Sequence, residues 1–390
     1  MRTRYWVCLA TAALCLTGCS GFWNAPSNGG GGGGGTTLSS GDIYVINAAT
    51  SQLVALYVNA GTMSTLPGSP YTLAAAPQAI TVAPNNAFLY VSTLGGIFVY
   101  AIDASTGRLT VGNSGQPISS DPATSMQVDS TNSWLVEGVS GSANLFAIHV
   151  NPSNGQLQSN QEQTAILPSS TVLQVAVSPD NTSVLVAMGP GGTATIPFNA
   201  GNANPFGNVG TIGTKGAAGA AESVAFDPII SGATAPRLFY IGETVAVSGT
   251  NTGGLRAFDY STKKEITNSP FAISGLAPYS ILPFSDGNYV YVLSRQTASG
   301  STGVIAGFSI SDTNNTLALT ALGSTFNAGT HPQSMVGDST KQFVFAVNLD
   351  GNPDLLGYTI DATNAGYLDK VASNTTGTDP VQATAIAAAH

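Results

Sequence analysis

The residues of this chain best suited to acid–base chemistry are one histidine and one glutamate. His331 directly precedes a proline, and an imidazole titrates near neutral pH, so this side chain could act as a general base. Glu222 could act as a general base or as a cation ligand. Each also has a structural interpretation, since a loop histidine can cap backbone groups and an acid can simply be solvated. Glu222 and His331 are therefore candidate catalytic residues, and the elements that carry them decide whether they meet.

Other catalytic signatures are missing from the sequence. It contains no zinc-binding spacing of Cys and His, no Gly-x-Ser-x-Gly nucleophile turn and no phosphate-binding loop. We therefore expect no cofactor, while a divalent metal in a channel stays open. Acidic residues outnumber basic ones by 20 to 11, and loss of Arg2 and Arg4 with a signal would change the net charge from −9 to −11. Nucleic-acid binding needs a basic face, so we expect no nucleic-acid partner.

Short strands and tight turns, rather than helices, must position these residues. The sequence is 43% hydrophobic but only 8% charged, and it contains 46 glycines. No stretch has a sustained 3.6-residue period, whereas Val, Ile, Phe and Tyr alternate with Gly, Ser, Thr and Asn. This pattern predicts an all-β fold.

A repeated unit of roughly 45 to 57 residues, the size of a propeller blade, runs through the chain. Its clearest copy has Pro-Gln-Ala-Ile-Thr-Val-Ala-Pro-Asn-Asn at 77–86, Phe-Leu-Tyr-Val at 88–91, Ile-Phe-Val-Tyr-Ala-Ile-Asp at 97–103 and Thr-Gly-Arg-Leu at 106–109. We interpret each copy as four strands. Six complete copies begin near residues 77, 122, 172, 221, 278 and 332.

A seventh copy is split between the two ends of the chain. Residues 380–386 supply only a first strand, and residues 43–59 supply the other three. Pairing these segments would close the ring and hide strand edges that otherwise invite aggregation. The sequence thus predicts a seven-bladed β-propeller of four-stranded blades over 41–390, closed by a C-terminal first strand that joins three N-terminal strands.

In such a ring, the loops before each first strand and after each second strand meet at one mouth of the central channel. Second strands are located by aligning Leu135-Val136, Leu185-Val186, Tyr240-Ile241, Tyr291-Val292 and Phe345-Ala346 with Tyr90-Val91. The first set of mouth loops then carries Asp121, Glu222, His331 and Asp379, and the second carries Glu137, Glu243, Arg295, Asn348, Asp350 and Asp354. Glu243 and Arg295 could pair across adjacent blades or form a plain surface salt bridge.

The repeated motifs, with Val-Tyr-Ala-Ile-Asp-x-x-Thr-Gly-x-Leu at 99–109 as the clearest, resemble the seven-bladed lactonase-type propellers. That family includes the bacterial 6-phosphogluconolactonases and is related to YVTN-repeat surface proteins. The resemblance implies lactone hydrolysis. Phosphosugar lactonases of this type carry Arg and His at blade starts, whereas here the matching residues are Gln78, Tyr279 and Gln333, with His331 as the cationic candidate.

The N-terminus has the features of an export signal. Two arginines within the first four residues precede an apolar run, 5–16, that is too short to span a membrane. Leu-Thr-Gly-Cys at 16–19 resembles the bacterial lipobox, which implies lipidation of Cys19 and cleavage before it. Ser20 rather than Asp follows this cysteine, and by resemblance to the sorting rule of enteric bacteria this favours the outer membrane.

The chain therefore divides into a signal peptide, 1–18, a lipidated cysteine with a glycine-rich tether, 19–40, and the propeller, 41–390. Seven glycines at 29–35 give the tether a reach of roughly 25 Å. We expect a monomer anchored in the cell envelope through Cys19, with a protein or glycan partner.

Two functions stay open. One is a non-catalytic binding or scaffold propeller, which the scarcity of His and Arg favours. The alternative is an envelope lactonase or related hydrolase acting on a non-phosphorylated lactone, as the resemblance implies.

Overall fold

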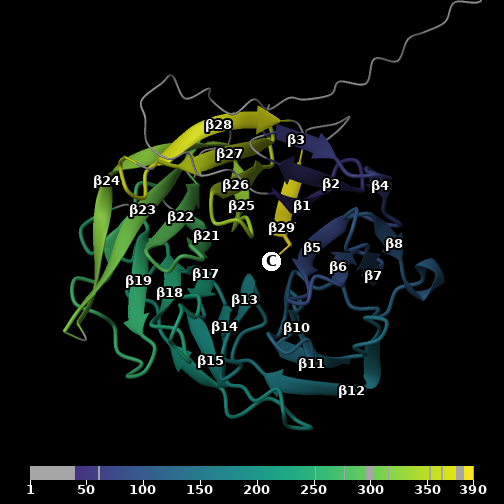
Figure 1. Cartoon of the computed structure of the whole chain (residues 1–390). Helices are drawn as coiled ribbons and strands as arrows, with labels where there is room; N and C mark the ends of the chain where they lie inside the picture. Colours follow the sequence, from purple (N-terminus) through teal and green to yellow (C-terminus); the bar gives the residue numbers. More distant parts are fainter. Residues whose placement is uncertain are drawn as a thin grey trace, which may run out of the picture.

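The fold was determined as a computed structural model, which describes residues 40–59, 62–250, 252–275, 277–295, 302–314, 316–350, 353–361, 363–374 and 382–389. These residues form seven antiparallel sheets arranged as blades around a central channel (Figure 1). None of the described segments is a helix long and apolar enough to cross a membrane. The predicted signal peptide and Cys19 lie outside the described residues, as does the tether apart from Ser40.

Each blade follows the chain outward from the channel. Blade 1 contains β29 (Ala383–Ala388), β1 (Ser40–Asn47), β2 (Gln52–Asn59), β3 (Thr62–Thr65) and β4 (Tyr71–Thr72); blade 2 contains β5 (Pro77–Val82), β6 (Phe88–Thr93), β7 (Gly96–Ile102) and β8 (Leu109–Val111). Blade 3 contains β9 (Ser125–Val128), β10 (Trp134–Gly138), β11 (Asn144–Val150) and β12 (Leu157–Ile166), preceded by a short 3-10 turn, η1 (Asn113–Gly115).

The remaining blades repeat this order. Blade 4 contains β13 (Gln174–Val177), β14 (Ser183–Ala187), β15 (Thr193–Pro197) and β16 (Gly210–Ile212); blade 5 contains β17 (Ala221–Phe226), β18 (Leu238–Glu243), β19 (Gly254–Asp259) and β20 (Phe271–Ala272). Blade 6 contains β21 (Ala277–Pro283), β22 (Tyr289–Arg295), β23 (Thr302–Thr313) and β24 (Thr316–Thr330); blade 7 contains β25 (Pro332–Gly337), β26 (Phe343–Asn348), β27 (Leu355–Ile360) and β28 (Leu368–Asn374).

The predicted ring and its closure are confirmed. The first strands β5, β9, β13, β17, β21 and β25 begin within three residues of the predicted starts. The C-terminal strand β29 pairs antiparallel with β1, from Ile43 opposite Ala388 to Asn47 opposite Ala383. Figure 1 shows the yellow C-terminal strand beside the purple N-terminal blade. One detail differs: β3 and β4 both pair with β2, so the outer edge of blade 1 is divided in two.

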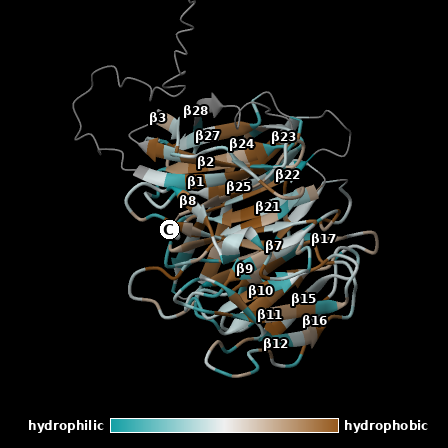
Figure 2. Ribbon diagram, turned by 90° about the vertical axis from the view of Figure 1, so that its right-hand side faces the viewer, coloured by the Kyte–Doolittle hydropathy of each residue, from teal (hydrophilic) through white to brown (hydrophobic). Residues whose placement is uncertain are grey.

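The core lies between the blades. Each of seven buried apolar clusters joins two neighbouring blades, for example β1, β2 and β29 of blade 1 against β26 and β27 of blade 7. Figure 2 shows the hydrophobic residues, in brown, concentrated in the strands. Burial of these faces from water is the main force that holds the ring together.

A repeated contact explains two elements of the sequence motif. The hydroxyls of Tyr90 and Tyr291, on the second strands of their blades, donate to the carbonyls of Gly155 and Gly366 in a turn of the next blade, at 2.8 Å in both cases. Tyr44 makes the corresponding, longer contact with Gly107 at 3.4 Å. The tyrosine and the turn glycine of the motif thus couple adjacent blades.

Candidate functional site

A bulge in the first strand of several blades directs one side chain toward the channel. The pairing of first and second strands shifts register by one residue in blades 2, 5, 6 and 7. The extra residues are Gln78, Glu222, Tyr279 and Gln333, and all four line the channel cavity of about 940 Å³. Because a bulge re-aims its side chain, these four positions form the polar part of the cavity wall.

The charged groups of the mouth gather on blades 5 to 7. Arg295, at the end of β22, donates from Nε to the carbonyl of Pro332 at 2.7 Å. Its guanidinium carbon lies 3.3 Å from the ring centroid of Tyr279, which is close enough for a cation–π interaction. The arginine is therefore held in place by blade 6 and by the start of blade 7.

The electrostatics of Arg295 connect it to two acids. Burial raises the pKa of Glu222, and the nearby Arg295 partly offsets this rise. Burial lowers the pKa of Arg295, while Tyr279, Glu222 and Asp350 oppose that change. We call Glu222, Tyr279, Arg295, His331 and Asp350 the mouth cluster, which combines two carboxyl groups with one guanidinium and one imidazole.

His331 is held by an acid rather than by backbone capping of its ring. Its Nδ1 contacts the carboxylate of Asp350, and its imidazole is mostly buried. The backbone of His331 lies in the left-handed region, with φ of 49°, and its carbonyl accepts from the side chain of Gln333 at 3.0 Å. Glu222 and Gln333 line the channel cavity, whereas His331, Arg295 and Asp350 are not among its described lining residues. The structure thus places the two predicted catalytic residues in one cluster, with Glu222 facing the channel and His331 beside it.

Glu137 does not lie at the mouth, and this prediction is wrong. Its side chain is fully buried on β10, and neither carboxylate oxygen has a hydrogen-bond partner. Leu135, two residues earlier on the same face, packs in the core between blades 2 and 3. Burial, followed by the charges of Asp121 and Glu162, raises the pKa of Glu137 to about 8. Glu137 is therefore a buried acid between two blades.

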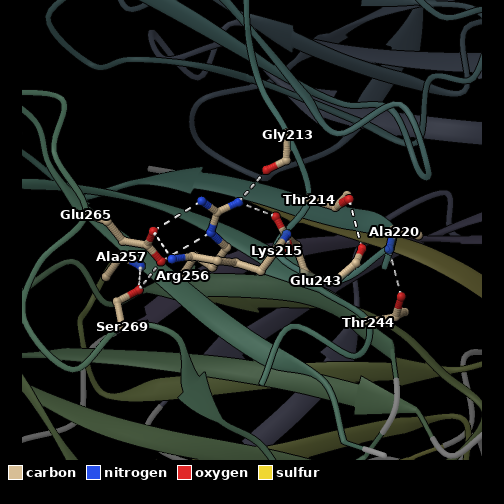
Figure 3. A network of polar contacts seen from close by, with 11 residues as sticks. Gly213, Thr214, Lys215, Ala220, Glu243, Thr244, Arg256, Ala257, Glu265 and Ser269 are labelled. Atoms are coloured by element: carbon tan, nitrogen blue, oxygen red, sulfur yellow. Dashed lines mark hydrogen bonds and ion pairs between the residues drawn. The ribbon is translucent and has the colours of Figure 1, made fainter. Parts of the chain in front are cut away.

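The predicted pairing of Glu243 with Arg295 is also wrong. Glu243 is fully buried and pairs with Arg256 of the same blade, with 2.5 Å between Oε1 and Nη1. Glu265 completes the network by accepting from Arg256 at 3.2 Å and from Lys215 at 2.9 Å, as Figure 3 shows. The acid therefore adds no free charge to the mouth.

This network fixes the loop that leads to Glu222. The backbone N–H of Lys215 donates to Oε2 of Glu243 at 2.9 Å, and Arg256 donates to the carbonyl of Gly213 at 2.8 Å (Figure 3). The loop 213–220 then enters β17, in which Glu222 is the second residue. Glu243 and Arg256 are thus positioning residues rather than parts of the cavity wall.

The other predicted mouth residues have mixed outcomes. Asp379 lies outside the described residues. Asn348 is buried at the end of β26 opposite Pro332, and both polar atoms of its amide lack a partner. Among the described residues, no group of three or more His, Cys, Asp or Glu side chains could hold a metal ion.

Tyr279 is the functional candidate that sequence reasoning did not single out. Its position opposite Gln78 and Gln333 in the repeat was a usable signal, because an aromatic residue there can carry a neighbouring cation. What the sequence did not show is that Arg295 of the same blade lies against its ring.

Comparisons with known proteins agree with this architecture. Residues 41–175 match the family model described as Lactonase, 7-bladed beta-propeller. No curated protein matches the chain.

Two solved structures show the same fold along the whole ring. A "putative 6-phosphogluconolactonase" from Bacteroides fragilis has a TM-score of 0.68 at 14% identity, with 92% of this chain and 100% of that chain covered. The periplasmic gluconolactonase of Pseudomonas aeruginosa has a TM-score of 0.64 at 14% identity, with 90% and 99% covered. Together with the family match, these findings place the chain among the lactonase-like seven-bladed β-propellers.

Proposed function

We propose that the mouth cluster is a binding site for an uncharged, polyhydroxylated ligand of the sugar type. The observation that carries the proposal is the delivery of Glu222, Tyr279 and Gln333 by three consecutive blades to one side of the channel wall. A carboxylate and an amide accept and donate hydrogen bonds to hydroxyl groups, and a tyrosine ring can pack against a sugar face. Few convergent polar groups in a concave site are typical of small-molecule recognition.

The charge balance of the cluster favours a neutral ligand. Glu222 and Asp350 are opposed by Arg295, whose guanidinium already faces Tyr279, Pro332 and the two acids. A phosphate dianion would normally be held by a bidentate arginine, which this arginine is poorly free to provide. We therefore infer that the ligand carries no phosphate.

A non-catalytic role agrees best with the position of the imidazole. A general base must reach the reacting proton or a bridging water, and His331 is not among the described residues that line the cavity. Its ring is engaged by Asp350. Binding without turnover, or a scaffold role, needs no such base.

The alternative function is hydrolysis of a neutral lactone. The contact between His331 and Asp350 favours it, because a carboxylate that orients an imidazole prepares it to take a proton from water. Arg295 could then stabilise the negative charge that develops on the carbonyl oxygen. The gluconolactonase named among the similar structures makes a sugar lactone the natural substrate to test.

One experiment separates these functions. Glucono-1,4-lactone binding is measured by calorimetry, and acid release is followed in a pH-stat, for the wild type and for Glu222→Gln, Arg295→Met and His331→Ala. We expect binding that weakens by at least about 10-fold in Glu222→Gln and Arg295→Met, the loss typical of a charge-assisted hydrogen bond. We expect no acid release above the spontaneous rate.

Asp369→Asn, which removes an exposed carboxylate from the outer strand β28, is the matched control and should leave binding unchanged. Acid release that disappears in His331→Ala would establish the lactonase alternative. Rapid turnover of 6-phosphogluconolactone, or binding that all three mouth variants leave intact, would contradict the proposed ligand site.

We further propose that the protein is a cell-envelope lipoprotein held through Cys19, with the outer membrane as its location. The sequence supports this through its basic start, its short apolar run and the Leu-Thr-Gly-Cys motif at 16–19. In the native host, Cys19→Ala should abolish labelling by a radioactive fatty acid and should either release the protein to the soluble fraction or leave it unprocessed. Ser20→Ala, next to it, should keep the label. A processed Cys19→Ala chain that still fractionates with membranes would show that the lipobox interpretation is wrong.

A further inference from the structure

An aromatic side chain covers a turn glycine at several of the junctions between blades. Phe88 of blade 2 lies against Gly155 of blade 3, and Tyr289 of blade 6 lies against Gly366 of blade 7, so closely that a Cβ on either glycine would overlap the ring. Each ring precedes by two residues the tyrosine that donates to the same glycine. The aromatic side chain thus fills the space beside the turn.

Blade 1 has an acid at this position. Asp42 stands two residues before Tyr44, and it lies opposite Tyr57 as Phe88 lies opposite Ala101. Its carboxylate approaches Gly107, which has a positive φ of 64° and no room for a Cβ. A carboxylate therefore replaces the aromatic ring at the junction between blades 1 and 2.

The replacement coincides with a cavity of about 560 Å³. Its wall includes Asp42, Tyr57, Leu66, Pro67, Gly107 and Ser339. This volume is within the range of roughly 300–1,000 Å³ that is common for small-molecule sites. The cavity is far from the mouth cluster along the strand, because Asp42 is near the start of β1 and the mouth lies beyond its other end, Asn47.

The carboxylate of Asp42 is not used by the fold. It makes no hydrogen bond or ion pair with another described residue, although it is half-buried. Burial raises the pKa of Asp42, which shows that the fold gives its charge no compensating partner. Removing a charge from water without a partner is costly, so a cation that enters the cavity would be stabilised.

The other groups of the cavity define the cation more closely. Tyr57 presents an aromatic ring and a hydroxyl, and Ser105, Thr106 and Ser339 add further hydroxyls. Those of Ser105 and Thr106 already donate to Asp103, so toward a ligand they act as acceptors. The ligand must therefore bring hydrogen-bond donors in addition to its positive charge.

We propose that this cavity, the Asp42 pocket, binds a compact organic ammonium ion that carries hydroxyl groups, of the amino-sugar class. Asp42 pairs with the ammonium group, Tyr57 packs against the ring, and the serine and threonine hydroxyls accept from the ligand hydroxyls. A metal ion fits less well, because a single carboxylate supplies few of the six to eight oxygen ligands that calcium takes. This site is independent of the function proposed for the mouth cluster.

The test compares glucosamine with glucose, which differ in one ammonium group. Binding to the purified chain is measured by ligand-observed NMR titration for the wild type, Asp42→Asn, Glu222→Gln and Asp369→Asn. We expect glucosamine to bind the wild type, Glu222→Gln and Asp369→Asn equally, and Asp42→Asn at least about 10-fold more weakly. Glucose should bind at least about 10-fold more weakly than glucosamine to the wild type, for the same reason.

The outcomes that overturn the proposal are distinct. Equal binding of glucose and glucosamine by the wild type would show that the Asp42 charge is not the determinant. Loss of glucosamine binding in Glu222→Gln but not in Asp42→Asn would assign the ligand to the mouth cluster. No binding of glucosamine by the folded wild type would remove the amino-sugar class. Thermal melting of Asp42→Asn checks folding, and a Tyr57→Leu variant, which keeps the charge, should weaken binding without abolishing the preference over glucose.

Discussion

Chains that end before Pro380 are expected to lose their single cooperative unfolding transition, and to aggregate. The truncation removes β29, which pairs with five residues of β1 and buries Ala383, Ile386, Ala387 and Ala388. It exposes the edge of β1, which carries the fully buried residues Ile43 to Ile46. An open apolar edge of this kind is a template for pairing with another chain.

The size of this effect follows from the loss of both a strand ladder and a core contact. The buried side chains of β29 belong to the clusters between blade 1 and both of its neighbours. The combined loss is comparable with the total stability of a typical domain, about 5–15 kcal/mol. Calorimetry and light scattering measure it, and removal of His390 alone is the control, since it leaves β29 complete. An unchanged melting curve after the larger truncation would refute the role of β29 in ring closure.

Glu137→Gln is expected to stabilise the protein at neutral and alkaline pH. Glu137 titrates at about 8 in the folded chain against a reference value of 4.5, so the folded state binds its proton more tightly than the unfolded state does. Stability therefore falls as the pH rises from 4.5 to about 8, because the unfolded chain releases the proton first. The full contribution is present below pH 4.5 and is lost above pH 8.

The magnitude follows from the same two values. At pH 7 the unfolded state gains about 3 kcal/mol from ionisation that the folded state does not. Glutamine has the shape of the protonated acid and does not titrate, so we expect a gain of about 2–3 kcal/mol at pH 7 and close to none at pH 4.5. Urea unfolding at both pH values measures it.

The matched control is Asp369→Asn, which removes an exposed carboxylate and should change stability little at either pH. A gain of equal size at pH 4.5 and pH 7 would mean that glutamine acts through packing and not through titration. A loss of stability at pH 7 would mean that the ionised acid has a partner.

The misplacement of Glu137 has a simple geometric origin. The repeat alignment matched Leu135-Val136 with Tyr90-Val91, whereas the pairing of first and second strands matches Val136 with Tyr90. Successive side chains of a strand point to opposite faces, so a slip of one residue reverses the face of every side chain. Glu137 therefore occupies the position of the buried Val91, not one at the mouth.

The partner of Glu243 could not be read from the repeat for a different reason. Arg256 and Arg295 both follow Glu243 in the chain, and the sequence does not rank them. Arg256 is opposite Ile241 on the neighbouring strand, which brings its guanidinium to the end of β18. Arg295 instead lies against Tyr279 of its own blade.

The sequence by itself determined the number of blades, their boundaries to within a few residues, the closure by the C-terminal strand and the loops that meet at the mouth. These features depend on the alternation of apolar residues and on local turn chemistry, both of which repeat seven times and reinforce one another. Tertiary structure alone decided which charged groups are paired, that Glu137 is buried, and that Asp42 borders a cavity. Those outcomes depend on how one blade docks against the next, which joins side chains more than 60 positions apart, as Tyr44 and Gly107 are, through contacts that no local pattern encodes.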